Sequence, residues 1–251
     1  MPLKTSENAV LGGRLTLRQP LRGHRVGHDA ILLAAATAAQ AGQHAVDLGA
    51  GVGAAGLALA QRVEGLAVSL VEIDRALAQL SRDNAERNDL ASVRAVCLDI
   101  AAPAAAFAAA GLAKEAADRV LMNPPFNALQ NPSPEPGRRT AHAAPRGALR
   151  QWVRTASRLL RAGGLLTLIW RADGLDEVLG ELASGFGAVT LLPVHPKPGA
   201  PAIRVLARAT KGSRAPLALL PGLVLTDLNG KPSEAAENVL RRGGVLPLAE
   251  I

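Results

Sequence analysis

The tetrapeptide Asn123-Pro124-Pro125-Phe126 carries groups suited to chemistry on a planar amine. An exocyclic amine is a poor nucleophile, because its lone pair is delocalised into the ring. The Asn123 side-chain oxygen and the Pro124 carbonyl can each accept one of its N–H groups, which pushes the nitrogen toward a tetrahedral geometry. The prolines stiffen that carbonyl, and Phe126 offers a stacking face for a flipped base. We take these four residues as the candidate catalytic residues, acting by positioning rather than by acid–base catalysis.

A glycine-rich segment over residues 47–53, Asp-Leu-Gly-Ala-Gly-Val-Gly, could bind the second reactant. Its glycines let the backbone approach a ligand closely, and a helix that follows presents free N–H groups. The run from Gly51 to Gly56 also satisfies the dinucleotide pattern G-x-G-x-x-G, so the glycines alone do not choose a cofactor.

Acidic residues at three successive strand ends favour S-adenosyl-L-methionine. Asp47 can pair with a cationic amino group, whereas it would repel a pyrophosphate. Glu72 can accept from both ribose hydroxyls, which suits either cofactor, and Asp99 can meet an adenine amino group. The candidate cofactor contacts are Asp29, Asp47, Gly49, Gly51, Gly53, Glu72, Ile73, Asp99, Ile100 and Asn123.

These residues fall at the ends of elements in a predicted alternation of strands and helices. We expect strands over 44–48, 67–73, 93–98, 119–122, 165–170, 189–194 and 203–207, and helices over 30–39, 54–62, 74–88, 149–160, 175–183 and 234–241. The joint between the last two of these strands is too short for a crossover helix, so they should pair antiparallel. The pattern resembles the α/β class I methyltransferase (Rossmann-like) fold, with a seven-stranded, mostly parallel sheet, a final antiparallel hairpin and a short C-terminal extension.

We expect three parts along the chain: an N-terminal segment and helix packing on the cofactor site (1–40), a core (41–210) and the C-terminal extension (211–251), which includes a short strand-like piece over 223–225. Residues 127–145 are expected to form a long exposed loop. Asp29 is a candidate N-cap for the first helix. The pair Gly163-Gly164 is expected to end the helix over 149–160.

The bulk composition excludes several classes of protein. Hydrophobic residues make up 49% of the 251 residues, enough for a packed core, but no run of about 18 apolar residues predicts a membrane span. Cys97 is the only cysteine, so internal disulfides and a cysteine-rich zinc site are excluded. It falls inside an expected strand and is expected to be buried. The histidines show no metal-ligand spacing, and we expect a cytoplasmic protein without metal, as a monomer or weak homodimer.

The net charge of +7 favours a polyanionic partner. From Arg138 to Arg171 there are eight arginines and no acids, and three of them recur every fourth residue, on one helix face. A solvated helix face is the alternative interpretation. The candidate nucleic-acid contacts are Arg138, Arg139, Arg150, Arg154, Arg158, Lys211 and Arg214.

Nearly the whole chain resembles one family. The signature D/N/S-P-P-Y/F/W at a fourth strand end is typical of amino-methyltransferases. The segment 26–34, Val-Gly-His-Asp-Ala-Ile-Leu-Leu-Ala, is similar to V-G-T-D-G-I-L-L-G of bacterial tRNA adenine-N6 methyltransferases, which modify the adenine beside the anticodon of a valine tRNA. Segments 198–206 and 226–234 also resemble that family. His28, Phe126 and the pair Lys231-Pro232 depart from its pattern. The resemblance implies adenine N6 in RNA, specifically tRNA, as the substrate, and places Asp29 in a turn closing over the cofactor.

Other functions remain open from the sequence. Glutamine-N5 protein and guanine-N2 rRNA methyltransferases share the signature, although the former carry a longer N-terminal domain and the latter are often longer. DNA remains a possible substrate. A non-catalytic RNA-binding module that holds the cofactor is a different class of function, and a nucleotide-dependent oxidoreductase is favoured only by the ambiguous glycines.

Overall fold

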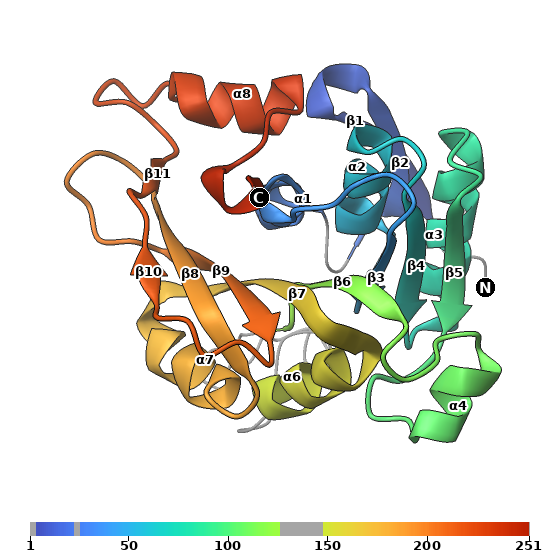
Figure 1. The fold of residues 1–251 in the computed structure, drawn as a ribbon. Coiled ribbons are helices and arrows are strands. Elements are labelled where there is room, and N and C mark those ends of the chain that lie inside the picture. Colours follow the sequence, from blue (N-terminus) through green and yellow to red (C-terminus); the bar gives the residue numbers. More distant parts are fainter. Residues whose placement is uncertain (1–3, 23–25, 126–147, 251) are drawn as a thin grey trace.

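The computed structural model describes residues 4–22, 26–125 and 148–250. Within these residues the chain alternates strands and helices around one large sheet (Figure 1). The strands are β1 (Thr5–Val10), β2 (Leu15–Pro20), β3 (His44–Leu48), β4 (Ala67–Glu72), β5 (Val93–Cys97), β6 (Ala117–Met122), β7 (Leu160–Arg171), β8 (Phe186–His195), β9 (Arg204–Lys211), β10 (Ala218–Leu219) and β11 (Leu223–Val224). The helices are α1 (His28–Ala36), α2 (Ala54–Arg62), α3 (Arg75–Arg87), α4 (Ala104–Ala109), α6 (Ala148–Leu159), α7 (Leu175–Leu182) and α8 (Glu234–Arg242).

The large sheet confirms the expected class I methyltransferase arrangement. Its order is β10-β8-β9-β7-β6-β3-β4-β5, and β11 also pairs with β8. Strands β3 to β7 pair parallel, whereas β9 runs antiparallel to both β7 and β8. The seven expected strands are all present, and β11 corresponds to the strand-like piece expected over 223–225. Because β10 and β11 both join the sheet, it has nine strands rather than seven.

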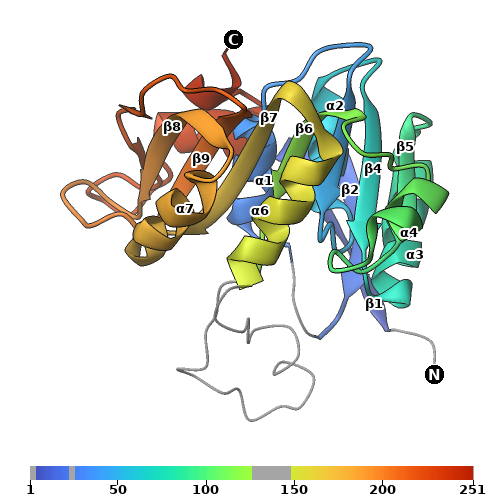
Figure 2. The same cartoon turned by 60° about the horizontal axis from the view of Figure 1, so that its bottom comes forward.

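Helices cover both faces of this sheet, as a parallel sheet requires. Helices α1 and α2 lie on one face, and α4, α6 and α7 lie on the other (Figures 1 and 2). Two hydrophobic clusters correspond to these faces: one includes Leu32, Leu57 and Leu70, and the other includes Trp152 and Leu168. With both faces packed, the carboxyl ends of the parallel strands are the natural place for a ligand.

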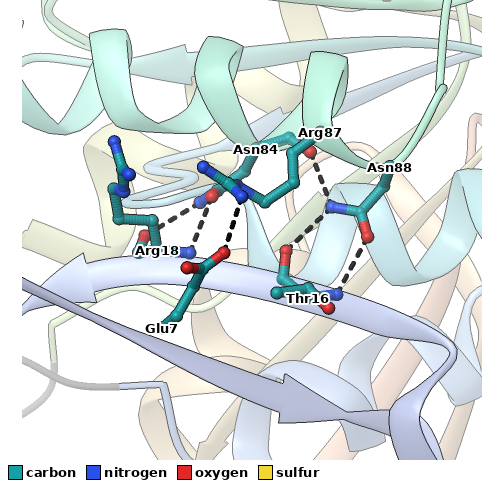
Figure 3. Close-up of polar contacts among 6 residues, drawn as sticks. All are labelled: Glu7, Thr16, Arg18, Asn84, Arg87 and Asn88. Carbon is teal, nitrogen blue, oxygen red and sulfur yellow. Dashed lines mark hydrogen bonds and ion pairs between the residues drawn. The ribbon is translucent and has the colours of Figure 1, made fainter.

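The N-terminal segment forms a hairpin that the sequence pattern did not predict. Strands β1 and β2 pair antiparallel as a separate sheet, from Thr5 opposite Pro20 to Val10 opposite Leu15. Leu15 and Leu17 are completely buried, so one face of β2 joins the main core. Figure 3 shows the edge of β2 that faces α3.

The expected stop of a helix at Gly163-Gly164 is wrong. Helix α6 ends at Leu159, and β7 begins at Leu160 and continues through the glycines. The register with β6 shifts between Ala117–Leu160 and Arg119–Leu165, so extra residues of β7 form a bulge there. The bulge favours glycine at position 164, because a Cβ there would lie 3.2 Å from the Asp118 carbonyl oxygen.

Candidate active site

A cavity of about 580 Å³ lies at the carboxyl ends of β3, β4, β5 and β6. Most of the residues predicted from the sequence line this one cavity. They are Asp29, Asp47, Gly49, Gly51, Glu72, Ile73, Asp99, Ile100, Asn123, Pro124 and Pro125. Gly53 does not line it: this residue is the N-cap of α2 and packs against Leu57 and Leu70. Phe126 lies outside the described residues.

The glycine loop follows directly from the end of β3. Gly49, Gly51 and Gly53 all adopt positive φ angles, of +67°, +58° and +90°, which side chains rarely tolerate. A Cβ at Gly49 would lie only 2.2 Å from the indole ring of Trp152. Trp152 also lines the cavity but was not among the predicted site residues, because only the fold brings α6 beside this loop.

Replacing Gly49 with alanine should weaken S-adenosylmethionine binding at least about tenfold, equivalent to about 1.4 kcal/mol. The added Cβ would push Trp152 into the cavity or displace the loop. Calorimetric titration with the cofactor measures the effect. Gly42→Ala is the matched control, because its φ is +78° and its Cβ would meet no described atom within 4 Å. Equal losses in the two variants would attribute the effect to backbone strain alone.

Glu72 holds the loop and faces the cavity. One carboxylate oxygen accepts the Gly51 N–H at 2.8 Å, and the other accepts the Asp74 N–H at 2.9 Å. The side chain ends β4 and is only 8% exposed. A carboxylate fixed in this way has further lone pairs that can accept from a diol.

Asp47 is buried under the same loop. It is 2% exposed, and one of its carboxylate oxygens accepts the Gly56 N–H at 2.8 Å. Burial raises the pKa of Asp47 to about 7, because desolvation opposes the charged form. The Gly56 hydrogen bond lowers this pKa and the nearby charge of Glu72 raises it. A cationic group in the cavity would therefore stabilise the carboxylate.

The outer wall of the cavity comes from the end of β5. Asp99 is exposed, and its side chain accepts the Ala101 N–H at 2.8 Å. The Ile100 carbonyl accepts the Thr155 hydroxyl at 2.9 Å, which ties this wall to α6. Cys97 is exposed rather than buried, so the expectation of a core position is wrong. The reason is that β5 is the last strand of the sheet, with a neighbour on one side only.

The candidate catalytic turn follows directly from the end of β6. Strand β6 ends at the fully buried Met122, and the chain then leaves the sheet through the two prolines. Asn123 is half-buried, Pro124 is buried and Pro125 is exposed. All three line the cavity that Asp47, Glu72 and Asp99 also line, so the two proposed acceptors share one space with the acids.

An ion pair closes another side of the cavity. Arg204, at the start of β9, contacts Asp29 of α1 with an N–O distance of 2.9 Å. The N-cap of α1 is Gly27, and Asp29 lies in the first turn, so its predicted capping role is wrong. Arg204 was not among the predicted site residues, because only the fold brings β9 beside α1.

Those predicted nucleic-acid contacts that the structure describes do not form one cluster. Arg150 pairs with Glu181 of α7 at 3.1 Å, Arg154 is exposed, and the Arg158 guanidinium lies 4.5 Å from the centroid of the Phe107 ring. Lys211 bonds to Glu115 and the Leu160 carbonyl. It therefore lies at the amino ends of the parallel strands, whereas the cavity lies at their carboxyl ends. Arg214 follows it there, and Arg138 and Arg139 lie outside the described residues.

The acidic residues that line the cavity fit S-adenosylmethionine. The cavity combines a buried acid for an ammonium group, an anchored carboxylate for ribose hydroxyls and a further acid at the next strand end. In the described residues there is no group of three potential metal ligands among histidine, cysteine, aspartate and glutamate. No described helix is both long enough and apolar enough to cross a membrane.

Known proteins with related sequences support this fold. The model of the family "Methyltransferase small domain" matches residues 24–195. The protein named tRNA1(Val) (adenine(37)-N6)-methyltransferase from Bacteroides fragilis is 30% identical over 185 residues, covering 72% of this chain and 75% of that protein. A protein of the same name from Porphyromonas gingivalis is 30% identical over 158 residues, covering 61% of each chain.

Two solved structures are also similar. A protein from Agrobacterium tumefaciens, described as a predicted O-methyltransferase, has a TM-score of 0.74 and 31% identity, covering 87% of this chain and 98% of that one. The Thermus thermophilus 16S rRNA N2 G1207 methyltransferase, solved with AdoMet and guanosine, has a TM-score of 0.58 and 23% identity, covering 84% and 51%. That second likeness supports the fold alone.

The fold and the site together define a class I S-adenosylmethionine-dependent methyltransferase. The chain belongs to the methyltransferase small domain family, and proteins named tRNA1(Val) (adenine(37)-N6)-methyltransferase are among its relatives.

Proposed function

We propose that this methyltransferase acts on the exocyclic N6 amine of an adenine in tRNA. The observation that carries the proposal is that Asn123 and Pro124 line the same cavity as the three strand-end acids. Asn123 supplies a side-chain acceptor, and the Pro124 carbonyl supplies a second. The names of the relatives support adenine N6 in tRNA as the target.

Bound S-adenosylmethionine would supply an electrophilic methyl group on a positively charged sulfur. Asn123 and Pro124 would hold the two N–H groups of the amine, so that its lone pair points at that methyl carbon. Transfer would form a bond from nitrogen to carbon and break the carbon–sulfur bond, whose electron pair would stay with the leaving group as a neutral thioether. The nitrogen then releases one proton to water, because neither amide acceptor is a base.

The proposed tRNA substrate implies a cytoplasmic enzyme. It also requires a surface for phosphates near the cavity, since phosphate contacts supply much of the affinity for nucleic acids. Arg150 and Arg154 are exposed on α6, the helix that also contributes Trp152 to the cavity. These two residues support an RNA-binding surface better than Lys211 or Arg214, which lie at the amino ends of the parallel strands, away from the cavity.

Mass spectrometry of nucleosides tests the substrate. Unmodified tRNA, rRNA and DNA pools are incubated with the protein and S-adenosylmethionine, and we expect N6-methyladenosine to increase in the tRNA pool alone. Formation of N2-methylguanosine would instead identify guanine N2 as the target. If protein fractions are incubated in the same way, methylated glutamine in them would identify a protein substrate. Normal cofactor binding without transfer to any pool would instead support a non-catalytic RNA-binding module.

A further inference from the structure

Asn84 of α3 contacts two segments that are far apart in the sequence. Its side-chain oxygen accepts the Arg18 N–H at 2.7 Å, and its amide nitrogen donates to the Arg18 carbonyl at 3.0 Å (Figure 3). The same nitrogen donates to the Val52 carbonyl at 3.0 Å. The side chain is completely buried, and both of its amide protons are used. One amide therefore links the N-terminal hairpin to the glycine loop.

Asn88 makes similar contacts with the hairpin but does not bond to the loop. Its oxygen accepts the Thr16 N–H at 2.8 Å, and its nitrogen donates to the Thr16 carbonyl at 2.8 Å (Figure 3). Its nitrogen also donates to the Asn84 carbonyl within α3, at 2.7 Å. The two asparagines, one helical turn apart, thus pair with β2 as a neighbouring strand would. A Glu7–Arg87 ion pair at 2.6 Å adds a contact from β1.

The Val52 carbonyl belongs to the part of the loop that lines the cofactor cavity. Val52 is 7% exposed and lies between Gly51, whose N–H is held by Glu72, and Gly53, whose N–H donates to the Ala50 carbonyl at 2.8 Å. A buried carbonyl without a partner is costly, so the Asn84 bond favours one orientation of the Val52–Gly53 peptide. Gly53, which follows that peptide, leaves it easier to rotate once the bond is lost.

We propose that Asn84 is a positioning residue that makes the N-terminal hairpin part of the cofactor-binding apparatus. Docking of β2 orients the Asn84 amide, the amide orients the Val52 carbonyl, and the loop then keeps the shape that accepts the cofactor. This coupling does not depend on which nucleotide is methylated. Its readout is the affinity for S-adenosylmethionine, so it can fail or succeed separately from the proposed tRNA substrate.

A matched pair of variants tests this role. Asn84→Ala and Asn88→Ala each remove two bonds to β2, but only Asn84→Ala also frees the Val52 carbonyl. We expect the dissociation constant for S-adenosylmethionine to rise about tenfold or more in Asn84→Ala and to stay within about twofold in Asn88→Ala. Backbone amide exchange over residues 50–53 should be faster in the first variant than in the second. Calorimetry and hydrogen exchange give the two readouts.

Perturbing the hairpin tests the coupling from its other end and leaves Asn84 in place. Arg18→Pro removes the N–H that Asn84 accepts, whereas Thr16→Pro removes the N–H that Asn88 accepts. Proline is tolerated where a strand's N–H does not pair with another strand. We expect only Arg18→Pro to weaken cofactor binding, and this pair decides the question if Asn84→Ala fails to fold. Equal affinity losses in the two asparagine variants, or in the two proline variants, would overturn the proposal, as would unchanged affinity in both pairs.

Discussion

Replacing Asn123 with alanine should abolish methyl transfer while S-adenosylmethionine binding largely survives. The variant loses the side-chain acceptor for one amine N–H, so the lone pair is no longer directed at the methyl group. A single preorganised hydrogen-bonding group in an active site is worth about 100-fold or more in rate. The cofactor contacts of Asp47 and Glu72 would be unchanged, because each is held by its own strand and backbone bonds. Transfer of labelled methyl groups to tRNA and calorimetric cofactor binding measure the two quantities.

Asn123→Asp is the informative companion to that variant. It keeps an acceptor oxygen at the same place, so some transfer should return relative to Asn123→Ala. A parallel loss of cofactor affinity and transfer in Asn123→Ala would assign this residue to the cofactor site instead. Full activity in Asn123→Ala would remove it from the reaction altogether.

Cofactor affinity should rise with pH up to about pH 7 and then level off. Burial raises the pKa of Asp47 to about 7, so much of this carboxyl is protonated in the free protein below that pH. The cationic amino group of S-adenosylmethionine would bind the charged form and lower this pKa. Binding then releases a proton, and affinity falls about tenfold for each pH unit below the pKa. Calorimetry in buffers of different ionisation enthalpy counts the released proton.

Asp47→Asn provides the control for this titration. It removes the charge and should weaken binding at pH 8, with little remaining dependence on pH near 7. The free protein offers a second check. Because the folded pKa lies above the ordinary value of 3.8, the folded state binds more protons than the unfolded state between these values. This group therefore makes stability decrease as pH rises through that range, and the slope should be smaller in Asp47→Asn. Unchanged affinity in Asp47→Asn at pH 8 would contradict the assigned contact.

Most of the sheet and the strand-end residues could be predicted because they depend on local pattern. Alternating apolar runs placed Asp47, Glu72 and Asn123 at strand ends, and parallel strands bring such ends to one edge. The hairpin was missed because Thr5–Val10 is polar and has no buried run of its own. Its edge is held by Asn84 and Asn88, about 70 residues away, and no local signal announces such bonds.

The basic residues show a different limit of sequence reasoning. Their spacing predicted a common helix face, but electrostatic partners are set by tertiary contacts. Glu181 lies 31 residues after Arg150 and reaches it only because α7 packs against α6. Arg204 and Trp152 were missed for the same reason, since each enters the cavity from an element that local pattern could not place beside β3.

The C-terminal extension has a consequence for how the chain is made. Strands β10 and β11 pair with β8 at the sheet's edge, and the Leu246 N–H donates to the Ala35 carbonyl at 2.9 Å. Arg208 of β9 also donates to the carbonyl of Leu248 at 2.6 Å. An uncovered strand edge is a template for aggregation. The ribosome must therefore release the chain through Val224 before both strands can shield β8, and a chain that stopped before Ala218 would carry an open edge into the cell.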